Sequence, residues 1–306
     1  MPTPTEEEVR GFMTSLSNRG RWGADDELGT LNLITPEKRV SAASLVRIGR
    51  AVSCAAPILK FQQASDVPFP PLHFMIRSGE SVNPSRPGTV DFIAMVFHGL
   101  TTTHVDALSH SILDGRLYGG RDPSVVTTEL GATQLSVDAM RDGVVTRGVL
   151  LDVAGATQRE YLEPGEPIGP ELLESVERSQ GVRLGEGDAL LVRTGWWHHR
   201  RKHGPAVGRS RPGLHASALP WLHERGVAIL ATDAANDVVP SGYESLELPV
   251  HEIGQAAMGL CLVDVCDFDG LQAECAAAGR FDFLFMLGPL RLAYATGSPV
   301  NPIAVL

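Results

Sequence analysis

The feature that most constrains the fold is an alternation of two hydrophobic patterns along the chain. Apolar runs of strand length lie at 92–97, 148–153, 189–193, 227–232, 261–265 and 281–287. Stretches with a helical pattern separate the later runs and lie at 170–180, 215–224, 249–258 and 270–278. This alternation is typical of α/β folds. The runs around Leu150, Leu190 and Ile229 are apolar on both faces, which predicts a sheet covered by helices.

The first hundred residues carry fewer signals of this kind. A helix is predicted from Thr5 to Leu16, because Thr5 can cap it and three glutamates follow in its first turn. A second helix is predicted after Thr35, with Pro36 at its first position. Residues 66–87 are rich in Pro, Ser and Gly and show no sustained period. We therefore expect a long loop there, of the kind that can cover a functional site.

The composition is that of a globular protein and argues against several partners. Of 306 residues, 43% are hydrophobic and 20% are charged, and 26 basic against 36 acidic side chains give a net charge of -10. A negative chain repels a phosphate backbone, so we expect no nucleic-acid partner. No apolar run reaches the roughly 18 residues of a membrane span, and the first residues lack a leader pattern. We expect a cytoplasmic protein without a membrane partner.

Several common catalytic signatures are missing from the sequence. Neither a phosphate-binding P-loop nor the G-x-S-x-G turn of serine hydrolases occurs. The pair His251-Glu252 resembles the start of a zinc-protease motif, but the fifth position is Gln255 instead of histidine. The four cysteines include no Cys-x-x-Cys pair, so we expect them to be reduced thiols.

The residues best suited to metal binding or catalysis are concentrated in one segment. His98, His104, Asp106 and His110 follow directly after a predicted strand. His104 and Asp106 are two residues apart, so in an extended chain they project on the same side and can bind one ion. Imidazole and carboxylate together suit divalent Zn, Mn or Fe. The spacing alone fits equally well a strand end with a capping aspartate and an ordinary histidine, but the third histidine favours a site.

The pattern His104-x-Asp106-Ala-x-x-His110 resembles the core of the cyclase family, which includes bacterial kynurenine formamidases and isatin hydrolases. Segments 147–152, 187–196, 248–251 and 297–302 also resemble the larger members of that family. The resemblance begins at about residue 20 and implies a single cyclase-family domain over 1–306, with 1–20 as an N-terminal extension. It implies an α/β fold of the swivelling β/β/α type, a mixed sheet curled toward a barrel with helices outside. A homodimer or higher homo-oligomer is usual.

The same resemblance assigns roles to individual residues. His104 and Asp106 match metal ligands, and His110 matches the histidine that moves a proton on the substrate. His251 matches a second histidine of the catalytic site. Asp264 is the nearest match to a further carboxylate ligand. We therefore expect these five side chains in a single pocket around Zn or Mn.

The chain departs from the family at one ligand position. The family's first metal histidine lies four residues before the second, and that position is Leu100 here. His98 is the nearest spare imidazole, and it can reach the site only if the chain turns at Gly99. Two possibilities stay open: a rearranged set of ligands, or metal binding that is weak or lost.

The activity that the resemblance implies is metal-dependent hydrolysis of an amide, lactam or lactone bond in a small cyclic or aryl substrate. A divalent ion would activate water and polarise the carbonyl, and His110 would handle the proton. Two alternatives remain. The chain could be a metal-free binding protein that keeps the fold and the pocket, or a non-hydrolytic cyclase or isomerase of the same fold.

Two further groups of residues have an ordinary explanation beside a functional one. His198, His199 and His203 form another histidine cluster, but the three basic residues at 200–202 would repel a cation. Asp233 closes a predicted strand, where it either faces the site or caps a helix or turn.

Overall fold

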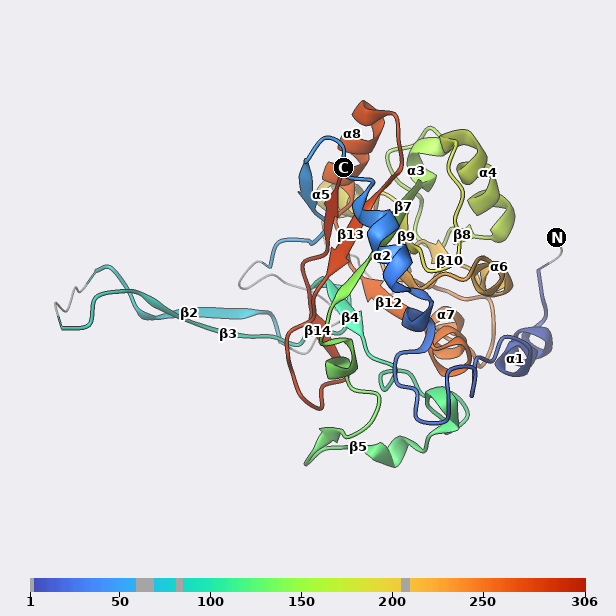
Figure 1. Cartoon of the computed structure of the whole chain (residues 1–306), viewed down its shortest axis with the longest axis horizontal. Coiled ribbons are helices and arrows are strands. Elements are labelled where there is room, and N and C mark those ends of the chain that lie inside the picture. Colours follow the sequence, from blue (N-terminus) through green and yellow to red (C-terminus); the bar gives the residue numbers. More distant parts are fainter. Residues whose placement is uncertain (1–2, 59–68, 81–84, 205–209) are drawn as a thin grey trace.

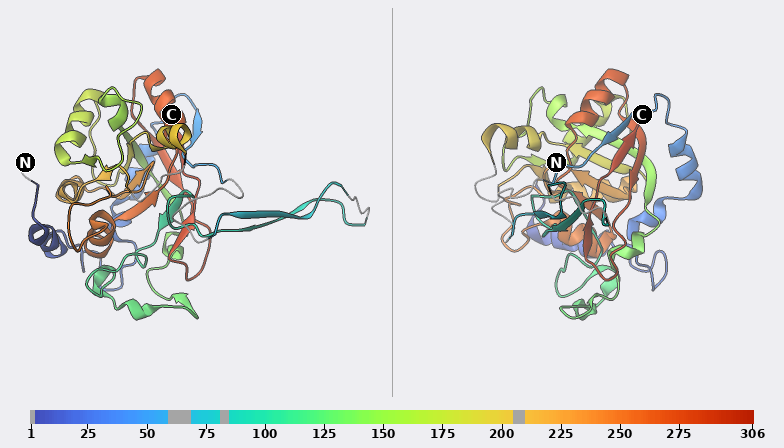
Figure 2. Two further views of the ribbon diagram at one scale, coloured as in Figure 1. Left: turned by 180° about the vertical axis from the view of Figure 1, so that it is seen from behind. Right: turned by 90° about the vertical axis from the view of Figure 1, so that its left-hand side faces the viewer.

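The computed structural model describes residues 3–58, 69–80, 85–204 and 210–306. Its centre is a curled sheet of nine strands (Figures 1 and 2). In spatial order these are β1 (Ala51–Ser53), β15 (Ile303–Val305), β13 (Asp282–Leu287), β7 (Val144–Asp152), β9 (Ala189–Arg193), β11 (Ile229–Thr232), β12 (Cys261–Asp264), β4 (His104–Asp106) and β14 (Gly297–Pro299). The neighbours β7, β9, β11 and β12 run parallel, and the remaining pairs are antiparallel. This mixed sheet confirms the predicted fold class.

Helices pack around the sheet, and their starts follow the expected capping rules. The α-helices are α1 (Glu6–Ser15), α2 (Pro36–Ala43), α3 (Val153–Ala156), α4 (Pro170–Gln180), α5 (Trp196–His203), α6 (Leu219–Arg225), α7 (Pro249–Ile253) and α8 (Asp269–Ala278). In α1, Thr5 and Glu8 form a reciprocal capping box. In α2, Thr35 accepts a hydrogen bond from the Lys38 backbone N–H. Both predicted N-termini are therefore confirmed.

Short elements complete the chain. A π-helical turn, Gly254–Met258, continues α7. Two small strand pairs are β5 (Val126–Thr127) with β6 (Gly131–Ala132), and β8 (Pro167–Ile168) with β10 (Gly213–Leu214). Single 3-10 turns lie at Gly29–Leu33, Tyr118–Gly120, Pro123–Val125, Val137–Met140 and Ala216–Ala218.

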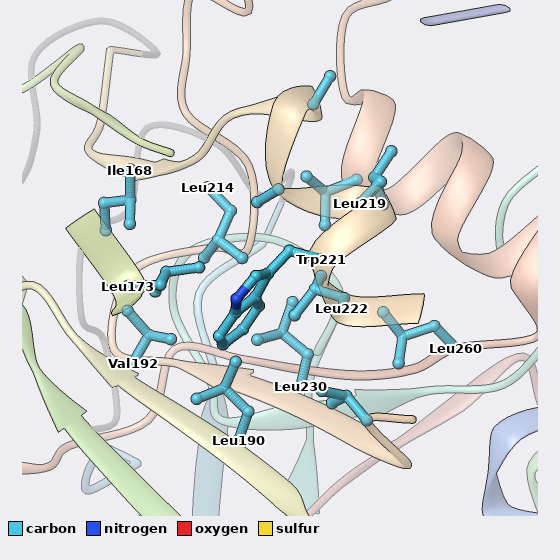
Figure 3. Close-up of a cluster of buried hydrophobic side chains, with 14 of the residues drawn as sticks. Ile168, Leu173, Leu190, Val192, Leu214, Leu219, Trp221, Leu222, Leu230 and Leu260 are labelled. Atoms are coloured by element: carbon cyan, nitrogen blue, oxygen red, sulfur yellow. The ribbon is translucent and has the colours of Figure 1, made fainter. Parts of the chain in front are cut away.

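The central strands are buried on both faces, as their apolar runs predict. In β9, Leu190 and Val192 belong to one hydrophobic cluster, whereas Ala189 and Leu191 belong to a second cluster on the other side of the sheet. Successive residues of a strand point to opposite faces, so one strand serves both clusters. Figure 3 shows Trp221 of α6 within the first cluster, above the strand residues.

The prediction of a long loop over 66–87 is wrong at residues 72–77. Strand β2 (Leu72–Arg77) lies inside it and pairs with β3 (Val90–Ala94) to form a hairpin that projects far from the body (Figure 1). A bulge between Met75 and Arg77 interrupts the pairing, and it also breaks the period-two pattern by which a strand is recognised. Parts of the predicted loop, at 66–68 and 81–84, lie outside the described residues.

Asp233, for which two uses were open, caps a helix. Its buried carboxylate accepts hydrogen bonds from the backbone N–H and the hydroxyl of Thr194, and from the backbone N–H groups of Gly195 and Trp196. Thr194 and Gly195 directly precede α5, and Trp196 is its first residue. The side chain thus joins the end of β11 to the beginning of a helix beside the site described below.

We expect Asp233→Ala to lower the free energy of unfolding by about 3 kcal/mol, because it leaves several buried donors without an acceptor. Glu129→Ala, which removes an exposed carboxylate, serves as control and should stay within about 0.5 kcal/mol of wild type. Urea unfolding followed by tryptophan fluorescence measures both. Equal midpoints for Asp233→Ala and wild type would contradict the capping role.

Candidate metal centre

Strand β4 carries the first two predicted ligands. His104 and Asp106 are its first and last residues, and both are buried. β4 pairs with β12 so that His104 lies opposite Asp264. Residues directly opposite each other in an antiparallel pair share one face of the sheet. The three side chains therefore converge, and a ligand atom of each lies within 4.8 Å of those of the other two.

The direction in which His104 can bind an ion is fixed by its backbone. Its Nδ1 lies 2.8 Å from the carbonyl oxygen of Thr102. Because a carbonyl oxygen only accepts, Nδ1 carries the proton and donates it. The lone pair of Nε2 is then available on the side of Asp106, whose Oδ1 lies 3.6 Å away. A second hydrogen bond that fixes the ring in this way is typical of metal-binding histidines.

The loop before β4 brings His98 back to the same place. The chain turns at Gly99, whose φ of +115° lies in the region that favours glycine. His98 Nδ1 lies 3.0 Å from Asp106 Oδ1, and the His98 ring stacks on the His110 ring with centroids 4.1 Å apart. His98, Asp106 and His110 form a second group with the spacing that an ion requires. The chain therefore makes the turn at Gly99 that His98 needs in order to reach the site.

Leu100 lies in different surroundings from the histidines. Its side chain packs against an apolar cluster of Ala56, Trp197 and Val265. Arg200 donates a hydrogen bond to the Leu100 carbonyl and lies over the Trp197 ring, 4.8 Å from its centroid. Leu100 thus anchors the loop to helix α5.

His251 enters the cluster from α7. Its Nε2 lies 3.1 Å from Asp264 Oδ2 and 3.5 Å from Asp106 Oδ2. Its ring centroid is 6.5 Å from that of His110. The structure therefore brings His104, Asp106, His110, His251 and Asp264 together across more than a hundred residues of sequence. Their individual roles remain predictions.

Sequence reasoning missed two residues that hold this cluster in place. Asp237 lies with Oδ2 2.5 Å from His251 Nδ1 and also accepts hydrogen bonds from the backbone N–H groups of Val250 and His251. Asn236 donates from its backbone and its side-chain amide to Oδ1 of Asp264. Both residues follow the end of β11, and polar residues beyond the ends of parallel strands are a signal that could have revealed them.

Charge and burial shift the pKa values of the cluster in opposite directions. Burial alone would raise the pKa of Asp106, but the neighbouring His110 and His251 outweigh it and hold that pKa well below its usual range. Burial alone would lower the pKa of His251, but the carboxylates of Asp264 and Asp106 outweigh it and raise that pKa well above its usual value. Burial lowers the pKa of His110 to about 4. His110 is therefore neutral at pH 7.

Two polar atoms at the centre, Asp106 Oδ1 and His98 Nδ1, are buried. Neither has a hydrogen-bond partner among the residues that the structure describes. They lie 3.0 Å apart. A carboxylate oxygen and an imidazole nitrogen can both offer lone pairs to a cation, and this combination suits Zn or Mn. The residues present therefore fit a divalent ion.

Comparison with known proteins identifies the family. A family model described as a putative cyclase matches residues 47–236. The chain belongs to the cyclase family. A crystal structure described as that of a novel cyclase is 31% identical to this chain and superposes with a TM-score of 0.86, over 96% of this chain and 99% of that one.

More distant solved structures share the cyclase fold. Isatin hydrolase A from Labrenzia aggregata, bound to benzyl benzoate, is 21% identical, with a TM-score of 0.62 over 88% of this chain and 97% of that one. A predicted metal-dependent hydrolase from Bacillus stearothermophilus is 16% identical, with a TM-score of 0.52 over 83% and 97%. At these low sequence identities, the similarity shows a shared fold only. A search of the curated proteins gave no significant match.

The other histidine cluster of this cyclase-family chain is built from ring contacts. His199 stacks on Trp196 and meets the Tyr161 ring edge-on, and His203 Nε2 lies 3.1 Å from the Tyr161 hydroxyl. Among the described residues, neither His199 nor His203 belongs to a group whose ligand atoms lie close enough together to bind one ion. In the same part of the chain, no helix combines the length and apolar character that crossing a membrane requires.

Proposed function

We propose that this cyclase-family chain is a metal-dependent hydrolase of an amide, lactam or lactone bond in a small cyclic or aryl substrate. The observation that supports this most is the setting of Asp106. Four imidazoles surround its buried carboxylate, and each has a ring nitrogen 3.0 to 3.9 Å from one of its oxygens; they belong to His98, His104, His110 and His251. His251, whose pKa is raised, faces this carboxylate and that of Asp264 as a donor. The other three imidazoles can offer lone pairs beside a buried carboxylate, which favours a cation at this point.

The ligand set follows from the geometry of this chain. His104, Asp106 and Asp264 would hold the ion, and His98 would replace the imidazole that position 100 lacks. When bound, a divalent ion polarises the substrate carbonyl and lowers the pKa of water. Asn236 orients Asp264, and the Thr102 carbonyl orients His104. These two contacts keep the ligand atoms directed at a common point.

His110 is the residue suited to move the proton. Its side chain is 32% exposed, whereas those of His104, Asp106, His251 and Asp264 are exposed by 7% or less. Because its pKa is lowered to about 4, the ring is neutral at pH 7 and can accept a proton from the attacking water. It can then return that proton to the leaving nitrogen or oxygen. His251, held by Asp237, lines the same site from the other side.

The purified protein is expected to retain a divalent ion and to hydrolyse members of a panel of small lactones, lactams and N-formyl aryl amines. Removing the ion with EDTA should lower the rate by roughly 10³, since Lewis-acid stabilisation contributes several kcal/mol. Added Zn or Mn should restore it. Mg should not, because it prefers oxygen ligands and octahedral geometry. Metal analysis and a spectrophotometric rate assay measure these effects.

Three outcomes would contradict the proposal. Protein that binds a panel compound but neither retains nor requires a metal would be a binding protein. Turnover that is insensitive to EDTA would remove the ion from the reaction. A product of the same mass as the substrate would indicate an isomerase or cyclase, because hydrolysis adds one water.

A further inference from the structure

The strand pairing that carries the candidate metal centre ends abruptly, and the next residue on each strand is unusual. The pairing of β4 with β12 stops at His104 and Asp264. Thr103 precedes His104, Val265 follows Asp264, and both are buried. In this register Thr103 and Val265 would form the next pair. They are joined through a side chain instead, because the Thr103 hydroxyl donates a hydrogen bond of 2.6 Å to the Val265 carbonyl oxygen.

Val265 has a backbone conformation that valine rarely adopts. Its φ is +61°, in the left-handed region, where a β-branched side chain is an outlier. Its backbone N–H donates to the Ala234 carbonyl at 2.8 Å, and its side chain packs beside Trp197 in an apolar cluster. Strained residues that their surroundings hold in this way are concentrated at active sites and ligand clamps. The strained turn begins directly after Asp264, so it affects where that carboxylate points.

Thr103 is held from several sides. Its hydroxyl accepts a hydrogen bond of 2.8 Å from the Ala56 backbone N–H while it donates across the end of the strand pair. Its carbonyl accepts another, of 3.0 Å, from the Val300 backbone N–H. A peptide unit is planar, so holding the Thr103 backbone also restrains the Thr102 carbonyl, which orients His104.

We propose that the Thr103 hydroxyl and the left-handed turn at Val265 are a positioning pair that sets the separation of His104 and Asp264 before an ion binds. A single hydrogen bond joins the residue before one ligand to the residue after the other, so the two strand ends cannot separate without breaking it. This inference rests on the proposed function, because it concerns ligands of the proposed ion. A site that is already assembled loses less freedom when it binds. Loss of this bond should therefore appear in the metal affinity.

The test measures Zn affinity by competition with a chromogenic chelator. Valine has the shape of threonine without the hydroxyl, and Thr103→Val should weaken Zn binding by roughly 10- to 100-fold, the usual effect of losing a contact that orients a metal ligand. Thr103→Ser keeps a hydroxyl and should recover most of that affinity.

Thr146→Val is the matched control. Thr146 is also buried, and its hydroxyl donates to the Gly187 carbonyl. It belongs to β7, a strand that carries none of the cluster residues. This variant should lower the urea midpoint, as Thr103→Val does, and yet bind Zn like wild type.

A second variant keeps the inference testable if Thr103→Val fails to fold. Thr103→Ala also lacks the hydroxyl, but it places no methyl group against the Val265 carbonyl, and it too should bind Zn more weakly. Wild-type affinity in a folded variant without the hydroxyl would overturn the positioning role. Equal weakening by Thr146→Val, or no recovery in Thr103→Ser, would do the same. Wild type that binds no Zn would overturn the proposed function and this inference together, whereas Zn binding that is indifferent to Thr103 would overturn this inference alone.

Discussion

His104→Ala is expected to abolish metal content and to lower turnover by at least roughly 10³. His104 offers the single lone pair of Nε2 toward Asp106 and Asp264, because its Nδ1 is committed to the Thr102 carbonyl. Without it, two carboxylates remain with His98 as the nearest imidazole, and the lost Lewis acid costs several kcal/mol of transition-state stabilisation. Metal analysis and the hydrolysis assay together measure the effect.

His110→Ala provides the contrast that separates a ligand from a proton carrier. It should keep the metal and lose turnover by about 10² to 10⁴, the usual contribution of a general acid or base. His223→Ala, which truncates a histidine of α6, a helix that carries none of the cluster residues, should change neither quantity. Equal loss of metal from His104→Ala and His110→Ala would show that His110 is a ligand. That result would favour the grouping of His98, Asp106 and His110.

Much of the sheet could be predicted because its central strands are buried on both faces. A strand such as β9 is then apolar at every position, and its helical neighbours, such as α4, have a clear period and capping residues. The hairpin of β2 and β3 could not be predicted in this way. Its strands are short, mostly exposed and interrupted by a bulge, and the register places Met75 and Ile93 on the same face as His73 and Asp91, so polar and apolar residues do not alternate cleanly.

The candidate site was predictable where it depends on local spacing and less so where it depends on strand pairing. His104 and Asp106 share a face because they are two residues apart in β4. Asp264 joins them because β12 pairs antiparallel with β4, and no local pattern in the sequence specifies that register. Asp237 was not predicted, because it contacts the cluster only through His251 and belongs to no recognisable sequence motif.

The proposed use of His98 as a ligand in place of residue 100 rests on how the loop is anchored. At position 100, the side chain packs on Trp197 and Val265, and Arg200 of α5 holds the backbone carbonyl. At position 98, the imidazole lies 3.0 Å from Asp106. A histidine at 100 would therefore face an apolar cluster, whereas the histidine at 98 faces the Asp106 carboxylate.

His98→Ala is accordingly expected to weaken Zn binding by about 10², the effect of removing a metal-site contact. Leu100→His should leave Zn affinity unchanged and lower the free energy of unfolding by about 1–2 kcal/mol, because it places a polar ring among apolar side chains. The double variant His98→Ala/Leu100→His should remain as weak as His98→Ala. Competition with a chromogenic chelator measures the affinities. Recovery in the double variant would mean that the loop can use the family's position, and wild-type affinity in His98→Ala would remove His98 from the ligand set.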